Sequence, residues 1–280
     1  MRLDFTKMHG LGNDFIVFDA SSETQIPSPA TLRKLADRRT GIGFDQALVL
    51  QPARRADTDV YYRIFNADGS EVEQCGNGAR CIARLVGERG APHRPELRLD
   101  SPGGLVLAKL RDDGLVSVAM GVPDFEPAAL PFIASHVAAV YPLEAAGTPI
   151  EIGAVSIGNP HAVLRVPDVA TAPVDRLGPA VENHARFPRR TNVGFMQVLD
   201  SNHILLRVHE RGAGETLACG TGACAAVAVG RRHGLLAERV DVDLPGGRLT
   251  VEWSGPGEPI WLTGPAAKAF AGHVEVNTEP

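Results

Sequence analysis

Two cysteines, Cys75 and Cys219, occupy the same short motif and are well suited to acid–base chemistry. Each begins the sequence Cys-Gly-x-Gly-Ala, which follows a strand-like run and precedes a helical pattern. We therefore expect each cysteine at or just before a helix N-terminus, where unpaired N–H groups and the helix dipole lower the pKa of a thiol. The glycines lack Cβ atoms, so a carboxylate could approach the same N–H groups. Each motif thus predicts a base and an anion site together.

Two such thiols on opposite faces of one carbon would invert the α-carbon of an amino acid. One sulfur removes the α-proton and the other returns a proton from the opposite face, whereas a single base tends to return the proton to the face it left. The ordinary pKa of a thiol, ~8.5, lies near working pH, so a thiolate and a thiol can coexist. Fixed N–H donors would stabilise the charge that develops on the carboxylate. The other cysteines, Cys81 and Cys224, fall inside the predicted helices, where we expect buried core residues.

An internal repeat supports the assignment of both cysteine motifs to a site. The segments around the two cysteines share Cys-Gly-x-Gly-Ala, and each has a glutamate four residues before its cysteine, Glu71 and Glu215. Two further pairs of segments match in the same order: 12–15 with 158–161, and 42–46 with 193–197. Chance matches would not keep this order, so we predict two homologous halves that meet near Gly121.

The elements that must position the cysteines follow from the periodicity of the sequence. Alternating or β-branched runs predict strands, among them 15–18, 60–65, 105–110, 116–120, 163–166, 204–209, 240–244 and 249–253. A helix is expected from Pro29, with Ser28 as its N-cap. The two key helices should cover about 77–88 and 221–233. The first has an apolar face, formed by Ala79, Ile82, Ala83 and Val86, whereas the second is apolar nearly all round and should be buried.

We predict an α+β fold of two pseudo-symmetric domains, each a curved β-sheet or barrel wrapped around a central helix. The active site is expected in the cleft between the domains. Residues 1–120 would form the N-terminal domain with Cys75, and residues 121–263 the C-terminal domain with Cys219. The C-terminal segment, residues 264–280, should return to the first domain.

Composition argues against several classes of protein. The formal net charge is −5 and no run of lysine and arginine offsets it, which disfavours nucleic-acid binding. No segment approaches the ~18 to 20 apolar residues of a membrane span, and the N-terminus lacks the apolar stretch of a signal peptide. We therefore expect a cytoplasmic protein without membrane contact, whose cysteines stay reduced.

Metal and cofactor chemistry are not expected either. The cysteines are six residues apart in the first motif and five apart in the second, which does not match the spacing of a zinc site. A pyridoxal-phosphate enzyme needs a lysine for its Schiff base. The chain has four lysines, none in a recognisable context for that role: Lys7, Lys34, Lys109 and Lys268.

Together, these motifs resemble the diaminopimelate epimerases, a family within the wider group that includes the proline racemases. The resemblance covers the whole chain, and no functional position departs from it. It is carried by MHGLGNDF (8–15), GFDQ (43–46), FNADGS (65–70), CGNGAR (75–80), GNPH (158–161), TNV (191–193), ERGAGET (210–216) and ACGTG (218–222).

The resemblance implies conversion of LL-2,6-diaminopimelate to the meso isomer, in lysine and cell-wall precursor synthesis, without pyridoxal phosphate or metal. It implies a homodimer, with the C-terminal segment near Phe270 as a possible contact. Cys75 and Cys219 would be the acid/base pair, and His161 and Glu210 would adjust their pKa values. The residues implied to bind substrate are Asn13, Gln46, Asn66, Gly76, Asn77, Asn159, Asn192, Glu210, Arg211, Gly220 and Thr221.

Two alternatives stay open from the sequence. A proline or hydroxyproline epimerase of the same group would use the same thiols, but it would need a compact pocket for one ring. A thiol redox sensor would instead join Cys75 and Cys219 in a reversible disulfide. Taken alone, the asparagines could be turn residues and His161 a packing residue. The repeat favours a site, because Asn66 and Glu210 each precede their cysteine by nine residues and yet differ. Such divergence is expected where a site distinguishes the two ends of its ligand.

Overall fold

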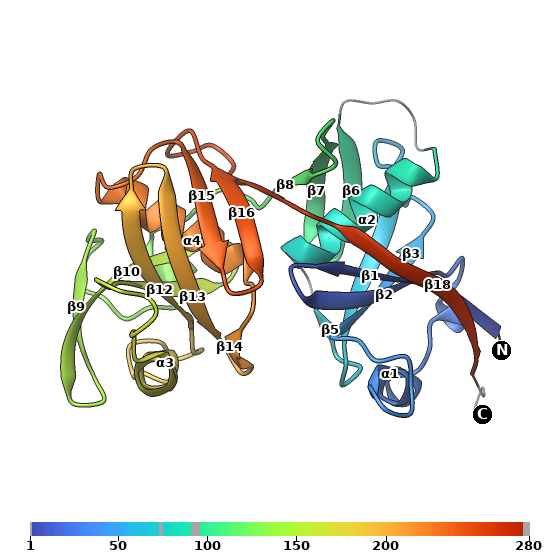
Figure 1. Ribbon diagram of the computed structural model, residues 1–280, viewed down its shortest axis with the longest axis horizontal. Coiled ribbons are helices and arrows are strands. Elements are labelled where there is room, and N and C mark those ends of the chain that lie inside the picture. The colour runs from blue at the N-terminus through green and yellow to red at the C-terminus, as the bar shows by residue number, and fades with distance from the viewer. Residues whose placement is uncertain (1, 73–74, 91–95, 277–280) are drawn as a thin grey trace. The chain divides into compact units, whose positions relative to one another are not determined.

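A computed structural model describes residues 2–72, 75–90 and 96–276, and Figure 1 draws its helices and strands. The chain forms two compact units: residues 1–118 with 264–280, and residues 119–263. The C-terminal strand belongs to the first unit, because it pairs antiparallel with the N-terminal strand from Arg2 opposite Glu275 to His9 opposite Ala267. The last residues of the expected returning segment, 277–280, lie outside the described residues.

The first unit contains strands β1 to β8 and β18 with two α-helices. In chain order they are β1 (Arg2–Gly10), β2 (Asn13–Asp19), α1 (Pro29–Ala36), β3 (Gln46–Gln51), β4 (Val60–Asn66), β5 (Glu71–Val72), α2 (Gly76–Glu88), β6 (Leu97–Ser101), β7 (Gly104–Leu110), β8 (Val116–Ala119) and β18 (Ala267–Glu275). A short 3-10 turn, Glu23–Gln25, precedes α1. The predicted cap of α1 is confirmed, because the Ser28 side chain accepts a hydrogen bond from the N–H of Thr31.

The second unit contains strands β9 to β17 with two α-helices. They are β9 (Tyr141–Ala145), β10 (Thr148–Ser156), β11 (Pro160–Arg165), α3 (Val174–Glu182), β12 (Asn192–Asp200), β13 (His203–Glu210), β14 (Gly214–Thr216), α4 (Gly220–Arg232), β15 (Arg239–Leu244), β16 (Gly247–Glu252) and β17 (Trp261–Gly264). A 3-10 turn, Pro127–Ala129, lies near its start. No helix in the described part of the chain is both long enough and apolar enough to cross a membrane.

The two units share one pattern of strand pairing, which confirms the internal repeat. In the first, β1 pairs antiparallel with β2, β2 parallel with β3, and β3 antiparallel with β4. Strand β4 also pairs with β5 and, in parallel, with β6, which continues to β7. In the second, β10 to β16 repeat these pairings in the same order. The predicted α+β class is therefore confirmed.

In each unit a curved sheet surrounds one long helix (Figure 1). Helix α2 contacts β1, β2, β6 and β7, and α4 contacts β10 to β13 and β16. Residues 222–230 of α4 are all buried, as the apolar pattern predicts. Gly153 on β10 permits this packing, because a Cβ there would stand 2.3 Å from a methyl carbon of Val229. The sheet thus holds each helix firmly, together with the residue that begins it.

One predicted equivalence between the halves is wrong. The sequence matched segment 42–46 with 193–197, but Gln46 begins β3, whereas 193–197 lie inside β12. Strand register pairs Gln46 with Phe15 and pairs Asn192 with His161 in the corresponding parallel ladder. Gln46 therefore corresponds to Asn192, because backbone pairing fixes the register and a short shared motif does not. The next ladder supports the match of 12–15 with 158–161 independently. Gln46 pairs with Asn66, and the pairing of Val193 with His209 sets Asn192 against Glu210. Asn66 and Glu210 each stand nine residues before their cysteine.

Candidate active site

Cys75 and Cys219 begin the two long helices, as predicted. Each is an N-cap residue with extended backbone, at φ −148° and ψ 111° for Cys75 and φ −117° and ψ 110° for Cys219. Each sulfur accepts a hydrogen bond from the backbone N–H three residues later, at 3.4 Å from Gly78 and from Gly222. The sulfur therefore takes the place that a serine or aspartate oxygen usually fills at a helix start. The first helical N–H groups lie next to each thiol, where an anion could bind.

The strand ends bring the other predicted residues of the first unit to the same edge of its sheet. Strand β2 begins at Asn13, β3 begins at Gln46 in parallel with it, and β4 runs back to end at Asn66. Gln46 donates a hydrogen bond to Asn66 Oδ1 at 3.0 Å. Residues 46 and 66 stand opposite each other because the antiparallel register pairs them.

An amide side chain, that of Asn13, lies beside Cys75. Its sulfur lies 3.9 Å from Asn13 Oδ1, a weak contact with the sulfur as donor. Asn77, in the first turn of α2, donates to the same Asn13 oxygen at 3.2 Å. Cys75 is half-buried, whereas Asn77 is buried. Asn13, Asn77 and Cys75 are therefore brought together, as predicted.

The second unit repeats this arrangement with different side chains. Asn159 precedes β11, Asn192 begins β12, and Glu210 ends β13. Asn159 donates to Thr221 Oγ1 at 3.4 Å, and Thr221 Oγ1 lies 3.5 Å from the Cys219 sulfur. Thr221 belongs to the first turn of α4. Asn159 and Thr221 are therefore brought together beside Cys219, as predicted.

Arg211 and Asn192 are joined through the backbone. The N–H of Arg211 donates to Asn192 Oδ1 at 3.0 Å, and Asn192 Nδ2 donates to the carbonyl of Pro160. The Arg211 guanidinium is exposed and donates to the carbonyl of Arg189 at 3.3 Å. It can therefore reach an external ligand.

The Cys219 thiol is held in its protonated form, which corrects the expectation that a helix N-terminus lowers its pKa. Burial raises the pKa of Cys219 well above its ordinary value, and the Glu210 carboxylate raises it further through its charge. The hydrogen bonds from Thr221 and Gly222 lower the pKa but are outweighed. Glu210 is itself fixed by Thr216, whose hydroxyl donates to it at 2.6 Å. A buried thiol beside a carboxylate favours the neutral form because that carboxylate would repel a thiolate.

His161 is buried beside Asn159. Its Nε2 lies 2.9 Å from Asn159 Oδ1. Burial lowers the pKa of His161 to about 3, and the charge of Arg211 contributes to the lowering. His161 is therefore neutral near pH 7. Its predicted role in adjusting a cysteine pKa stays a prediction.

Cys81 and Cys224 are core residues, as expected. Both lie inside the long helices and are fully buried. Burial raises the pKa of Cys81 to about 12. A thiol in such surroundings stays protonated, so it is a poor base at neutral pH.

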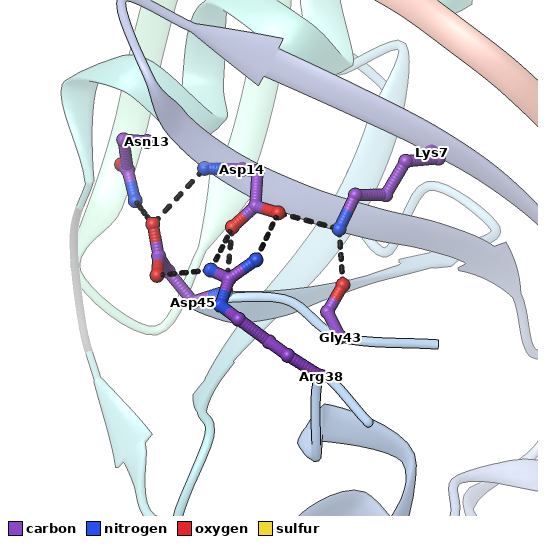
Figure 2. Close-up of polar contacts among 6 residues, drawn as sticks. All are labelled: Lys7, Asn13, Asp14, Arg38, Gly43 and Asp45. Atoms are coloured by element: carbon purple, nitrogen blue, oxygen red, sulfur yellow. Dashed lines mark hydrogen bonds and ion pairs between the residues drawn. The ribbon is translucent and has the colours of Figure 1, made fainter. Parts of the chain in front are cut away.

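The sequence reading missed a cluster of charged residues that supports Asn13 (Figure 2). Asn13 Nδ2 donates to Asp45 Oδ2 at 2.9 Å, and Arg38 joins Asp45 to Asp14. Lys7 completes the cluster with an ion pair of 2.6 Å to Asp14. Asp14 and Asp45 stand in the motifs that carry the family resemblance. Their pairing with Arg38 and Lys7 has no signal in local sequence, because Lys7 comes from β1 and Arg38 from the turn after α1.

Other features of the described residues lie apart from this site. No group of three or more His, Cys, Asp or Glu side chains among them could hold a metal ion. A surface cavity of about 450 Å³ in the first unit includes none of the predicted site residues. Its lining includes Asp19, Gln51, Asp59 and Arg89.

Comparison with known proteins gives consistent results. A family model described as diaminopimelate epimerase matches residues 5–126 and 153–269. The diaminopimelate epimerase of Alkalilimnicola ehrlichii is 57% identical over 279 residues, which are 99% of this chain and 100% of that protein.

Two solved structures share the fold at low identity. A phenazine biosynthesis protein of the PhzF family from Bacillus anthracis is 17% identical, with a TM-score of 0.69 over 99% of this chain and 100% of that chain. A hydroxyproline epimerase from Agrobacterium vitis, solved with trans-4-hydroxy-L-proline, is also 17% identical, with a TM-score of 0.69 over 98% and 92%. At this identity the likeness concerns the fold.

Proposed function

Since this chain belongs to the diaminopimelate epimerase family, we propose that it inverts one α-carbon of its substrate with Cys75 and Cys219 as the acid/base pair. The chain is an isomerase that converts LL-2,6-diaminopimelate to the meso isomer in lysine biosynthesis. The observation that carries the two-cysteine mechanism is the repeated placement of a cysteine at the N-cap of a long helix.

The proposed reaction needs two sulfur atoms in opposite protonation states. A thiolate takes the α-proton, so an S–H bond forms and the electron pair of the C–H bond passes into the carbanion. The second sulfur then gives its proton to the opposite face, and the new C–H bond leaves that sulfur as the thiolate. The proton count balances without an oxidant or a further reactant.

The first-turn N–H groups of the two helices are the proposed anion donors. These are the N–H groups of Gly76 and Asn77 in α2 and of Gly220 and Thr221 in α4. Helix geometry leaves such groups without a partner inside the helix, and they carry the positive end of the dipole. They would stabilise negative charge on the α-carboxylate more strongly as the carbanion develops.

We assign the initial acid to Cys219. Burial and Glu210 raise the pKa of that thiol, so it carries a proton to give. Cys75 lies beside the neutral amide of Asn13, which in turn accepts from Asn77. In this assignment the reaction starts with Cys75 as the base. Glu210 then also limits how long a Cys219 thiolate survives before it is reprotonated.

The asymmetry of the two halves suits a substrate with two amino-acid ends. Arg211 can bind a distant carboxylate with two parallel hydrogen bonds. Amide side chains donate and accept without net charge, which suits a zwitterionic group. The amides proposed for this task are Asn13, Gln46, Asn66, Asn159 and Asn192.

We also infer a cytoplasmic homodimer. A biosynthetic enzyme for an amino acid works where its substrates are made. Strand β18 offers a contact surface, because its residue Phe270 is 51% exposed although it packs edge-on against Phe5 at 6.0 Å. Sedimentation of the wild-type protein and of Phe270→Asp tests this inference. A monomeric wild-type protein would contradict it.

The deciding experiment follows isomers and deuterium together. Reduced protein, treated with chelator and given no cofactor, is incubated in D₂O with LL-diaminopimelate, L-proline or trans-4-hydroxy-L-proline. Chiral chromatography with mass detection should show conversion of diaminopimelate alone, with one deuteron at the inverted carbon. Turnover of a proline instead would replace the substrate and keep the thiol mechanism. No exchange with any of them, from folded protein with titratable thiols, would favour the redox-sensor alternative.

A further inference from the structure

We propose that Asp45 is a positioning residue whose carboxylate fixes the orientation of the Asn13 amide, so that Asn13 Oδ1 faces the Cys75 sulfur. The inference rests on the proposed role of Cys75 as an acid/base. It assigns a task to the charged cluster of Lys7, Asp14, Arg38 and Asp45, which the proposed reaction does not otherwise use.

The first observation is the contact between Asp45 and Asn13 (Figure 2). Asn13 Nδ2 donates to Asp45 Oδ2 at 2.9 Å. An ionised carboxylate only accepts hydrogen bonds, whereas an amide group has a donor end and an acceptor end. Asp45 therefore selects the nitrogen of Asn13, and the oxygen must point away from it.

The second observation is that Arg80, acting through Asn77, orients the other end of the Asn13 amide. Arg80 donates to Asn77 Oδ1 at 2.8 Å, and Asn77 Nδ2 donates to Asn13 Oδ1 at 3.2 Å. A guanidinium only donates hydrogen bonds, so it selects the oxygen of Asn77 and turns its nitrogen towards Asn13. The two amides lie between a group that only donates and a group that only accepts. In this chain of hydrogen bonds each amide has one orientation that satisfies both neighbours.

Asp45 is itself held on several sides. Its Oδ1 accepts from Arg38 at 2.8 Å, and its Oδ2 accepts from the N–H of Asp14 at 3.1 Å. The N–H of Asp45 donates in turn to Asp14 Oδ1 at 3.0 Å. Side chain and backbone of residues 14 and 45 are thus joined reciprocally, so the Asp45 carboxylate has little freedom to turn.

Asp14 is the centre of the cluster. Arg38 donates to both of its oxygens, at 2.9 and 2.7 Å, and Lys7 forms the 2.6 Å ion pair and also donates to the carbonyl of Gly43. Burial acts to raise the pKa of Asp14, but the hydrogen bonds from Arg38 and Lys7 outweigh it and hold the pKa well below its ordinary value. Asp14 is therefore charged at neutral pH and keeps Arg38 in place against Asp45.

The second half of the repeat lacks this device. Thr191 occupies the position that corresponds to Asp45, one residue before Asn192, and its hydroxyl donates to the carbonyl of Asn192. Asn159, which corresponds to Asn13, turns its nitrogen towards Thr221, and its oxygen lies beside His161. The amide near Cys219 thus has the opposite orientation to the amide near Cys75. The carboxylate at position 45 explains why the two differ.

The orientation has a chemical consequence at Cys75. An amide oxygen facing the sulfur accepts from the S–H group and disfavours the thiolate, whereas an amide nitrogen would donate to the thiolate and favour it. Asp45 therefore keeps the pKa of Cys75 higher, and the Cys75 thiolate that acts as the base in the proposed reaction is then the stronger base. In Asp45→Asn the new amide can present either end, so Asn13 is free to turn its nitrogen to the sulfur.

The test measures alkylation of Cys75 by iodoacetamide from pH 6 to 10, with the Cys75 peptide quantified by mass spectrometry. Four variants are compared with the wild-type protein: Asp45→Asn, Asn13→Ala, the double variant, and Asp19→Asn. The last is a matched control, because Asp19 forms a two-point ion pair with Arg89 in the same unit. Tyr62 on β4 and Cys81 on α2 are coupled electrostatically to Cys75, and no variant changes them.

We expect Asp45→Asn to lower the pH midpoint of Cys75 alkylation by about one unit, which means up to about tenfold faster reaction below the midpoint. Asp19→Asn should leave the midpoint unchanged. Loss of the Asp45 charge also acts on Cys75 directly, and this part persists when Asn13 is absent. The part transmitted by Asn13 disappears in the Asn13→Ala background, so the effects of the two single changes should not add.

An unchanged or raised midpoint of Cys75 alkylation in Asp45→Asn overturns the proposal. The proposal also fails if Asp45→Asn shifts the midpoint equally in the presence of Asn13 and in the Asn13→Ala variant. Alkylation does not depend on turnover, so the result separates this inference from the proposed function. If wild-type protein epimerises diaminopimelate and the midpoints do not move, the positioning role alone fails. If the midpoints move as expected but no α-proton is exchanged, the geometry stands and the acid/base role of Cys75 fails. Epimerase kcat/KM of Asp45→Asn should fall about tenfold, because a Cys75 thiolate of lower pKa is a weaker base towards the α-proton.

Discussion

The two halves of this molecule place a cysteine in the same backbone setting and surround it with different side chains. In both, the sulfur accepts the N–H of the third helical residue at 3.4 Å. Cys75 is half-buried and lies beside the amide of Asn13, whereas Cys219 is buried beside Glu210. The difference arises at corresponding positions: Asn66 in the first half and Glu210 in the second each stand nine residues before the cysteine. The backbone setting of the two thiols is thus the same, and the side chains that raise the pKa of Cys219 belong to the second half.

The largest expected effect on epimerase turnover comes from removing either thiol. We expect Cys75→Ala and Cys219→Ala each to lower epimerase turnover on the order of 10³-fold or more, because each removes one member of the proposed acid/base pair. Chiral chromatography of diaminopimelate isomers measures the loss. Cys81→Ala is the matched control, since Cys81 is a buried residue of α2, the helix that Cys75 caps. Substantial turnover by either active-site variant would rule out the two-base mechanism.

Changing residues 66 and 210 should shift the pKa values of the two cysteines in opposite directions. Because Glu210 raises the pKa of Cys219, Glu210→Gln should shift Cys219 alkylation to lower pH and reduce turnover about 10- to 100-fold. Asn66→Glu should shift Cys75 alkylation to higher pH by placing a carboxylate at the corresponding position. The pH midpoints of alkylation of the two peptides check both shifts. A Cys219 midpoint that stays in place in Glu210→Gln would show that burial alone raises its pKa.

The second glycine of the Cys-Gly-x-Gly motif should tolerate a methyl group less well in the second half than in the first. A Cβ at Gly222 would stand 3.3 Å from the Cys219 sulfur and 3.0 Å from Val208. At Gly78 its closest neighbour would be the end of the Leu48 side chain at 3.1 Å, which can move more easily. We therefore expect Gly222→Ala to lower kcat/KM about tenfold, and Gly78→Ala to lower it less. Equal losses in the two variants would contradict this difference in crowding.

The smallest expected effect is on acid stability, and it comes from a position where the halves differ. His161 corresponds to Phe15, which is also fully buried. The pKa of His161 is lowered from 6.5 to about 3, so the unfolded chain binds one more proton than the folded chain in that window. Stability should therefore fall as the pH drops from 6.5 towards 3, by up to about 1.4 kcal/mol per pH unit from this group.

The variant His161→Phe places the residue of the first half in the second. Urea unfolding at several pH values between 6.5 and 3 should show a shallower decline of the unfolding free energy than in the wild-type protein. The variant His136→Gln serves as the control, because it removes a histidine whose side chain is exposed. An unchanged pH gradient in His161→Phe would mean that other groups account for the acid sensitivity.

Most of the fold could be read from the sequence because its signals are local. The two cysteine motifs, the buried pattern of α4 and the Ser28 cap each depend on residues close in the chain, and each is confirmed. The named strand runs also overlap observed strands. The long strands β1, β10 and β18 were not singled out. Strand β18 depends on pairing with a strand more than 250 residues away, for which local pattern carries no signal.

Features that depend on register and burial were decided by the tertiary structure. The match of 42–46 with 193–197 is wrong because a short motif of identical residues does not determine which strand residues pair. The lowered pKa expected for Cys219 is reversed because desolvation and a carboxylate from another strand outweigh the helix N-terminus. The orientation of the Asn13 amide follows from Asp45, which a parallel strand brings beside it. The sequence alone thus determined which groups could carry protons, since this follows from residue type and local geometry. Their acidity and orientation were decided by the fold, because both depend on charges and hydrogen bonds that only strand pairing brings together.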